Sequence, residues 1–161
     1  MEKLKVLFVC YGNICRSPLA EGIFQELVKN ENLNNKIACD SCGVMAYHVG
    51  EEPHHRSIKV AKNHEIILNH RGRQLKADDF NKFDYIIAMD NDNFEDIMSL
   101  KNTIRNETAK VFLMRHFDNT AKDEDVPDPY YSEFEAYEEL YQMLLRANKT
   151  FLEYLKKENN L

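Results

Sequence analysis

The fold of this chain is decided by residues 5–18, KVLFVCYGNICRSP. Residues 5–10 form an almost continuous apolar run, which is typical of a strand buried on both faces of a parallel sheet. A turn containing Gly12 follows, and Ser17-Pro18 supplies an N-cap residue and a proline at the favoured first helical position. We therefore expect the central strand, a tight loop, and a first helix that runs to about Lys29.

The remaining chain alternates short apolar runs with helical periodicity. Strands are expected at 36–39, 84–89 and 110–114, and helices at 57–64 and 93–100. A capping-box pattern from Ser132 to Glu135 begins a long amphipathic C-terminal helix. Strands interleaved with helices imply βαβ units. The predicted fold is therefore α/β, a three-layer sandwich in which helices flank a four-stranded parallel sheet.

Length and composition narrow the function classes. A chain of 161 residues with 43% hydrophobic and 30% charged residues is typical of one globular domain, here 1–161. The net charge of −6 has the wrong sign for a protein that coats nucleic acid. No apolar run approaches the roughly 20 residues needed to cross a bilayer, and no signal-peptide pattern begins the chain. We expect a cytoplasmic monomer, with weak dimerisation left open, and neither nucleic acid nor membrane as a partner.

The loop after the first strand is predicted to bind phosphate. A strand-to-helix turn directs backbone N–H groups and the positive end of a helix at an anion. Gly12 permits a positive φ or a close ligand approach, Asn13 tolerates the left-handed conformation, and Arg16 offers a planar fork to two phosphate oxygens. The predicted phosphate-binding residues are Tyr11, Gly12, Asn13, Ile14, Cys15, Arg16 and Ser17.

Cys10, at the base of this loop, is the predicted nucleophile. The helix dipole, the loop amides and a hydrogen bond from Ser17 favour its thiolate form, and a thiolate beneath a phosphate attacks phosphorus to give a phosphocysteine. The leaving oxygen needs a proton. Asp128 is the best candidate for the acid, because two prolines hold it in the polar loop 118–131. Spacing alone does not exclude the other acidic residues of that loop, which are Asp118, Asp123, Glu124 and Asp125.

Several segments, in this order, resemble the low molecular weight protein tyrosine phosphatases. They are VCYGNICRSPLAEGIF (9–24), CDSCGVMAYHVGEEP (39–53), LNHRGRQL (68–75), FDYIIAMD (83–90) and VPDPYY (126–131). The resemblance implies that Cys10 is the nucleophile, Arg16 the phosphate clamp and Asp128 the general acid. It implies phosphotyrosine-containing proteins or small aryl phosphates as substrates, inorganic phosphate as product, and no cofactor or metal.

The resemblance also implies roles for supporting residues. The family's network that holds the loop in shape is matched by Asn13, Ser17, Ser41 and His70, and the aromatic pocket walls by Tyr47 and Tyr130. Tyr11 occupies a wall position that is often aliphatic in relatives. Asp90 matches a structural acidic position and Arg73 a basic one nearby. Ile14 resembles the tyrosine-specific members, because the family's arginine phosphatases carry a smaller polar residue there.

The remaining cysteines leave alternatives open. Cys15 packs under the loop or forms a disulfide with Cys10 on oxidation, and the two roles are compatible. Cys39 to Cys42 is a C-x-x-C motif, for which plain packing is favoured over a redox role, and both over zinc binding with a histidine at 48, 54 or 55. His48 takes a rim position that is acidic in some relatives.

Two other functions compete with a phosphatase. A thiol-dependent arsenate reductase resembles this loop, but it relays electrons through further cysteines and this chain has none after Cys42. A phosphotyrosine-binding module would use the same cradle without an acid, so the presence of both Cys10 and Asp128 disfavours it.

Overall fold

The computed structural model describes residues 2–105 and 107–161. Ten elements follow one another along the chain. They are β1 (Leu4–Cys10), α1 (Arg16–Asn30), β2 (Ile37–Gly43), α2 (His55–Asn63), α3 (Asp79–Lys82), β3 (Tyr85–Ala88), α4 (Asn91–Lys101), β4 (Lys110–Leu113), the 3-10 helix η1 (Met114–Phe117) and α5 (Phe134–Asn159).

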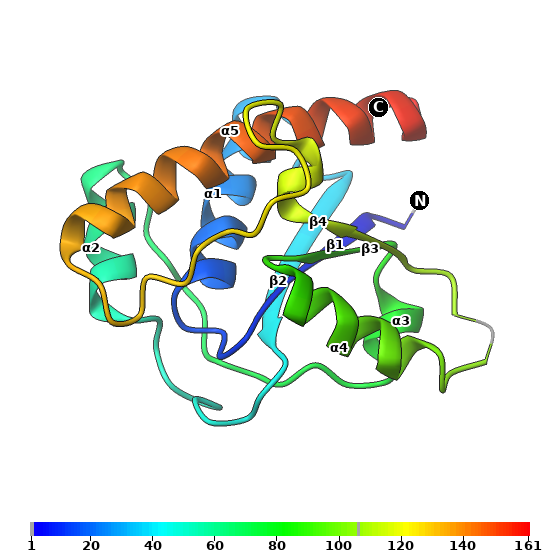
Figure 1. The fold of residues 1–161 in the computed structure, drawn as a ribbon. Helices are drawn as coiled ribbons and strands as arrows, with labels where there is room; N and C mark the ends of the chain where they lie inside the picture. Colours follow the sequence, from blue (N-terminus) through cyan, green and yellow to red (C-terminus); the bar gives the residue numbers. More distant parts are fainter. Residues whose placement is uncertain (1, 106) are drawn as a thin grey trace.

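The four strands form one sheet in the order β2-β1-β3-β4, and every neighbouring pair is parallel. The predicted α/β fold with a four-stranded parallel sheet is confirmed, and β1 is an interior strand as expected (Figure 1). Because parallel strands end at the same edge, Cys10 at the end of β1 lies beside Gly43 at the end of β2. The loops that follow β1, β2 and β3 therefore meet at one edge, where ligands bind in such sheets.

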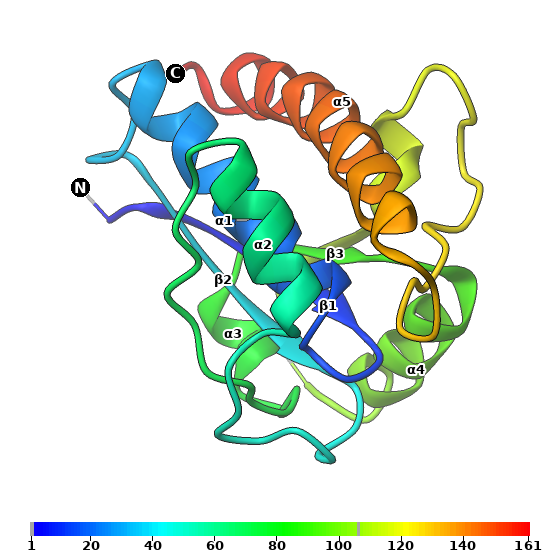
Figure 2. The same ribbon diagram turned by 90° about the vertical axis from the view of Figure 1, so that its left-hand side faces the viewer.

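Helices cover both faces of the sheet, which makes three layers. Alternate residues of β1 explain this: Val6 and Phe8 are buried in the core shared with α1 and α5, whereas Leu7 and Val9 are buried in the core shared with α3 and α4. A strand buried on both faces reads as an unbroken apolar run. In Figure 2, α1, α2 and α5 lie above the sheet and α3 and α4 lie below it.

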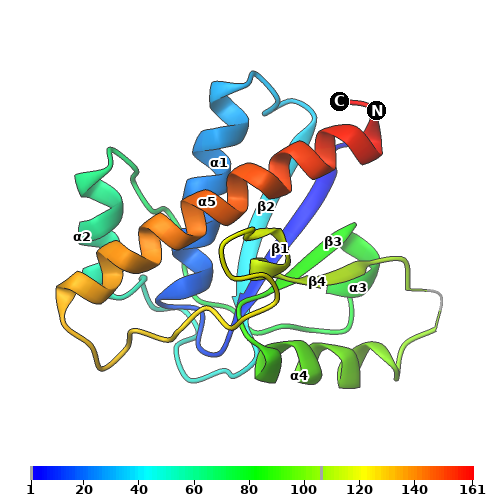
Figure 3. The same cartoon turned by 45° about the horizontal axis from the view of Figure 1, so that its top comes forward.

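The C-terminal helix α5 crosses the sheet beside α1 (Figure 3). Its inward face carries buried aromatic and aliphatic residues, among them Tyr137, Leu144 and Phe151, so its amphipathic pattern is explained by packing. Across the described part of the chain, no helix has both the length and the apolarity needed to cross a bilayer.

Two predicted helix starts are wrong. α1 begins at Arg16 with Cys15 as N-cap, and α5 begins at Phe134 with Glu133 as N-cap; neither cap makes a side-chain hydrogen bond within the described chain. Ser17 is not an N-cap because its hydroxyl contacts the Cys10 sulfur instead. The strand expected at 36–39 extends to Gly43, because its polar residues turn toward the loop after β1.

Candidate active site

The loop between β1 and α1 curls around the Cys10 sulfur. Asn13 has a left-handed backbone with φ 59°, as expected, and its N–H donates to Cys10 Sγ over 3.2 Å. Gly12 does not have a positive φ. A Cβ there would lie 3.1 Å from Cδ2 of His48, so a larger residue would require a small shift of that side chain. The conformation of the turn therefore depends on Asn13, and Gly12 leaves room for His48.

Cys10 is surrounded by hydrogen-bond donors. Its residue is 3% exposed, and Ser17 Oγ lies 3.0 Å from the sulfur. Ser17 Oγ accepts from Nδ2 of Asn13 over 2.8 Å, which leaves the serine proton free to point at the sulfur. A second acceptor for this proton, the Cys42 carbonyl, is more distant at 3.4 Å. The Ser17 hydroxyl and the Asn13 N–H are thus both placed to donate a hydrogen bond to the sulfur.

Arg16 spans the site from the first turn of α1. Its Nη1 donates to Oδ2 of Asp90 over 2.7 Å and to the Val126 carbonyl over 2.9 Å. Burial disfavours its charge, but Cys10, Asp90 and Asp128 outweigh this and raise the pKa of Arg16 above its ordinary value. Asp90 also caps α4 by accepting from the Asn93 N–H over 2.7 Å. The guanidinium is thus held in one orientation at the floor of the loop by Asp90 and the Val126 carbonyl.

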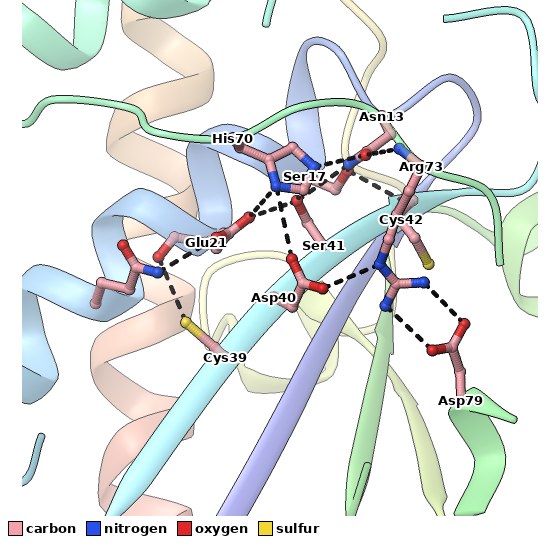
Figure 4. A network of polar contacts seen from close by, with 11 residues as sticks. Asn13, Ser17, Glu21, Cys39, Asp40, Ser41, Cys42, His70, Arg73 and Asp79 are labelled. Carbon is pink, nitrogen blue, oxygen red and sulfur yellow. Dashed lines mark hydrogen bonds and ion pairs between the residues drawn. The ribbon is translucent and has the colours of Figure 1, made fainter. Parts of the chain in front are cut away.

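A buried network supports the loop from behind (Figure 4). The Asn13 side chain donates to Ser41 Oγ over 3.0 Å, and its Oδ1 accepts from His70 Nε2 over 2.7 Å and from the Arg73 N–H over 3.1 Å. The structure therefore brings together all four residues that were expected to support the loop. Ser41 donates in turn to Glu21 Oε1 over 2.6 Å.

Glu21 is the member of this network that the sequence did not predict. It is 6% exposed, and burial raises the pKa of its carboxyl to about 7. Among the described residues, the only group with the spacing of a metal site is Glu21, Asp40 and His70, whose ligand atoms lie within 4.8 Å of one another. The same side chains bond to the loop-supporting residues, so they are already used in holding the loop.

The end of β2 supports the loop backbone directly. A Cβ on Gly43 would lie 2.9 Å from the Tyr11 carbonyl oxygen and 2.9 Å from the Gly12 carbonyl carbon. Just beyond it, Val44 N–H donates to the Cys10 carbonyl over 2.9 Å and Met45 N–H to that of Tyr11 over 3.0 Å. Only glycine at position 43 allows this contact without displacing the loop.

A cavity of about 430 Å³ opens above Cys10. Its lining includes nine residues expected to form the site, which are Cys10, Tyr11, Gly12, Ile14, Cys15, Arg16, Tyr47, Asp128 and Tyr130. The rings of Tyr11 and Tyr47 lie side by side, 6.4 Å apart between centroids. His48, which was expected at the rim, also lines the cavity, and so does Tyr131, which the sequence did not predict as a wall residue.

Asp128 is the acidic residue of the 118–131 loop that faces this cavity. Its Oδ2 lies 3.6 Å from Arg16 Nη2, and its side chain is 47% exposed. The rival acidic residues are engaged elsewhere or outside the lining: Asp118 is fully buried between two arginines, Asp123 pairs with His116, Asp125 accepts from the Asn91 N–H, and Glu124 does not line the cavity. Geometry therefore distinguishes Asp128, which spacing could not.

The other cysteines differ from Cys10 in their surroundings. Burial raises the pKa of Cys15 to about 12, and its sulfur lies 3.5 Å from the Tyr137 hydroxyl. Cys39 and Cys42 are three residues apart in β2, so their side chains point to opposite faces of the sheet. Cys42 belongs to the core under α3 and α4, whereas Cys39 packs against the core under α1. The C-x-x-C motif therefore forms neither a dithiol pair nor a two-cysteine zinc chelate.

Known proteins share both this sequence and this fold. The model of the family described as low molecular weight phosphotyrosine protein phosphatase matches residues 5–161. The protein of that name from Gallus gallus is 41% identical over 152 residues, covering 94% of this chain and 96% of the relative. The one from Rattus norvegicus is 42% identical over 148 residues, covering 92% and 93%.

Solved structures agree with these relatives. A protein tyrosine phosphatase from Entamoeba histolytica has a TM-score of 0.87 and 35% identity, and the match covers 99% of this chain and 100% of that chain. The Drosophila arginine phosphatase has a TM-score of 0.91 and 37% identity, covering 95% and 98%. With a matched family model, close relatives and a common fold, the chain belongs to the low molecular weight phosphotyrosine protein phosphatases and is a protein tyrosine phosphatase.

Proposed function

We propose that Cys10, Arg16 and Asp128 carry out phosphotyrosine hydrolysis in two steps. In the first step the Cys10 thiolate attacks phosphorus and the bond from phosphorus to the tyrosine oxygen breaks. Asp128 gives its proton to the departing oxygen, so that tyrosine leaves as a neutral phenol. The enzyme is left with an S–P bond at Cys10 and a carboxylate at Asp128.

The second step restores the enzyme. Water attacks phosphorus, the Asp128 carboxylate takes up a proton from that water, and the S–P bond breaks. Inorganic phosphate leaves, while Cys10 returns to thiolate and Asp128 to its acid form. No cofactor enters this balance. Arg16 and the N–H groups of residues 11–17 stabilise the equatorial phosphate oxygens in both steps, since phosphoryl transfer depends mainly on alignment and charge stabilisation.

One observation carries this proposal. The Cys10 sulfur lies within 3.0 Å of Ser17 Oγ and 3.2 Å of the Asn13 N–H, and shares one cavity with Arg16 and Asp128. A sulfur with a purely structural role has no need of two donors. Asn13, Ser17, Ser41 and His70 serve in this mechanism as the groups that keep the loop in its binding shape.

The pocket walls favour an aryl phosphate. Tyr11, Tyr47 and Tyr130 line the cavity above the sulfur, and flat rings pack well on aromatic walls. Because one structural neighbour is an arginine phosphatase, phosphoarginine is the competing substrate. We infer a preference for phosphotyrosine, because Ile14 adds an apolar side chain to the lining rather than a polar group for a guanidinium. Comparing kcat/KM for free phosphotyrosine and phosphoarginine tests this preference, and a higher value for phosphoarginine would contradict it.

We also propose a protective role for Cys15. A peroxide oxidises Cys10 to a sulfenic acid, and the Cys15 sulfur then displaces water to form a disulfide, which a thiol reductant reopens. The high pKa of Cys15 makes this second step slow at neutral pH. Both residues line the same cavity.

For the cellular context we infer one domain spanning 1–161 that acts as a cytoplasmic monomer without a metal. Residues of β1 and of α5 are buried in the same hydrophobic core, so both ends of the chain belong to one domain. All four cysteines are free, which suits a reducing compartment.

Variants test the assigned roles with para-nitrophenyl phosphate, which has a good leaving group, and with phenyl phosphate, which has a poor one. Cys10→Ser should abolish turnover while phosphate binding persists. Asp128→Asn should lower kcat/KM by about 100-fold or more for poor leaving groups, whereas the control Asp123→Asn changes a carboxylate outside the cavity and should leave kcat/KM unchanged. Equal losses for good and poor leaving groups in Asp128→Asn would exclude the acid role.

A further inference from the structure

The segment that carries Asp128 is tied down by a buried carboxylate. Asp118 is 0% exposed and accepts from Arg115 Nε over 3.0 Å, from Arg146 Nε over 2.8 Å and Nη2 over 2.9 Å, and from the Thr120 N–H over 3.1 Å. The pKa of Asp118 is lowered to about 2, and the largest contribution comes from its hydrogen bonds with Arg146. Buried carboxylates require such pairing. We call Arg115, Asp118 and Arg146 the Asp118 cluster.

The two arginines of the cluster differ in what else they hold. Arg115 is 8% exposed, and its Nη1 donates to the Asp125 carbonyl over 3.1 Å. Its own carbonyl accepts from the Asp123 N–H over 2.9 Å. Arg146 reaches Asp118 from α5, with a side chain that is 43% exposed. Arg115 therefore connects η1 to the chain that leads to Asp128, whereas Arg146 connects Asp118 to α5.

The backbone from Asp125 to Asp128 is constrained, so a shift of Asp125 cannot easily be absorbed before Asp128. Val126 N–H donates to the Met89 carbonyl over 2.8 Å, and the Val126 carbonyl accepts from Arg16. Pro127 then precedes Asp128, and proline fixes one of the two backbone angles of its residue. A displacement at Asp125 is thus passed along the chain to the carboxyl of Asp128, while Arg16 keeps its ion pair with Asp90 at 2.7 Å.

We propose that Arg115, held by Asp118, is a positioning residue for leaving-group protonation. This inference rests on the proposed role of Asp128 as the acid. Arg115 does not touch the substrate; it sets where the backbone at Asp125 lies, and so where the Asp128 carboxyl lies relative to the departing oxygen. Misplacement by about 1 Å lowers a rate by about 100-fold in such arrangements.

Matched variants separate positioning from simple stabilisation. Each of the variants Arg115→Lys and Arg146→Lys keeps a positive charge beside Asp118. Only Arg115→Lys removes the guanidinium that donates to both Asp118 and the Asp125 carbonyl. Phenyl phosphate releases a phenol as weakly acidic as tyrosine and needs the proton, whereas para-nitrophenyl phosphate releases a more acidic phenol and needs it less. Since kcat/KM reports the steps up to P–O cleavage, the ratio of the two kcat/KM values measures acid assistance.

Arg115→Lys should lower kcat/KM for phenyl phosphate by about 10-fold to 100-fold and for para-nitrophenyl phosphate by less than about 3-fold. Arg146→Lys should leave this ratio unchanged even if it lowers the melting temperature. Inhibition by inorganic phosphate, which reports on the loop and Arg16, should stay within about 3-fold of the unmodified enzyme for both variants. If Arg115→Lys does not fold, Asp118→Asn is the second variant and should shift the ratio in the same direction. Equal losses for both substrates would overturn the inference.

Asp128→Asn in the same assay distinguishes the two ways to fail. If Asp128→Asn shows no leaving-group dependence, the acid assignment itself is wrong. If it does and Arg115→Lys does not, only the positioning role is wrong. The double variant Arg115→Lys, Asp128→Asn should lose no more than Asp128→Asn alone for phenyl phosphate, because a positioning residue acts through the group it positions.

Discussion

Replacing Asn13 tests how far one side chain maintains the catalytic loop. Its amide donates to Ser17 and Ser41 and accepts from His70 and the Arg73 backbone, over distances of 2.7 to 3.1 Å. Its backbone is left-handed, with φ 59°. Asn13→Gly removes the four hydrogen bonds and keeps the backbone relaxed, whereas Asn13→Ala removes them and also leaves in the left-handed region a Cβ without the polar side chain that lets asparagine adopt it.

The magnitudes follow from these contacts. Buried hydrogen bonds contribute roughly 0.5 to 1.5 kcal/mol each, so Asn13→Gly should lower the free energy of unfolding by about 2 to 6 kcal/mol. The left-handed backbone adds roughly 1 kcal/mol for Asn13→Ala. Because Ser17 then loses the donor that orients its hydroxyl, kcat/KM should fall by about 10-fold or more in both variants, as for the loss of a positioned group.

Urea unfolding and steady-state kinetics with para-nitrophenyl phosphate give both quantities. Asn32 supplies the control, because it is exposed and left-handed, with φ 57°. Asn32→Ala should be less stable than Asn32→Gly by a similar roughly 1 kcal/mol, with kcat/KM unchanged. If Asn13→Gly were as stable and as active as the unmodified enzyme, the network behind the loop would have no role in holding it.

Three other changes test separate contacts. Glu21→Gln should abolish a pH dependence of the free energy of unfolding. The Glu21 carboxyl has a pKa of about 7 in the folded protein, compared with an ordinary 4.5. The protonated carboxyl therefore stabilises the fold fully below pH 4.5, and this contribution is lost as the pH rises through 7. The free energy of unfolding should therefore fall by up to about 3 kcal/mol over this range relative to Glu21→Gln, and parallel curves would refute this. Gly43→Ala should lower both stability, by about 1 to 3 kcal/mol, and kcat/KM, because its Cβ would displace the Tyr11 carbonyl; a fully active variant would show that the loop can shift. Cys15→Ser should recover less activity than the unmodified enzyme when peroxide treatment is followed by a thiol reductant, and equal recovery would contradict a protective disulfide with Cys10.

The sequence predicted the part of the site that is local. Cys10 to Ser17 is contiguous, so the turn and the presence of a helix after it could be predicted from residue types alone, whereas phosphate binding by the loop stays a prediction. Ser17 shows the limit of such reading. As a serine before a proline it fits an N-cap, but the Cys10 sulfur seven residues away takes its hydroxyl, and the helix begins at Arg16, two residues before the expected first helical residue Pro18.

Residues whose partners are distant in sequence were not predictable from pattern. Asp118 appeared only as one of several loop carboxylates, because Arg146, which pairs with it, lies 28 positions away. Glu21 lies on the first helix and gives no local signal of its bond to Ser41 in β2. The polar residues of β2 shortened the predicted strand for the same reason, since they face the loop network rather than an apolar core.

In the proposed mechanism Cys10 and Asp128 have different tasks, and the structure gives them different surroundings. Cys10 is 3% exposed and lies beneath two hydrogen-bond donors, the Ser17 hydroxyl and the Asn13 N–H. The Asp128 side chain is 47% exposed and can exchange protons with water. In the proposed mechanism Asp128 gives a proton to the departing oxygen and takes one from the attacking water, and its place in the lining of the cavity brings it near both. The acid role therefore depends on where the Asp128 carboxyl is held, which is what the proposed contact from Arg115 to the Asp125 carbonyl sets.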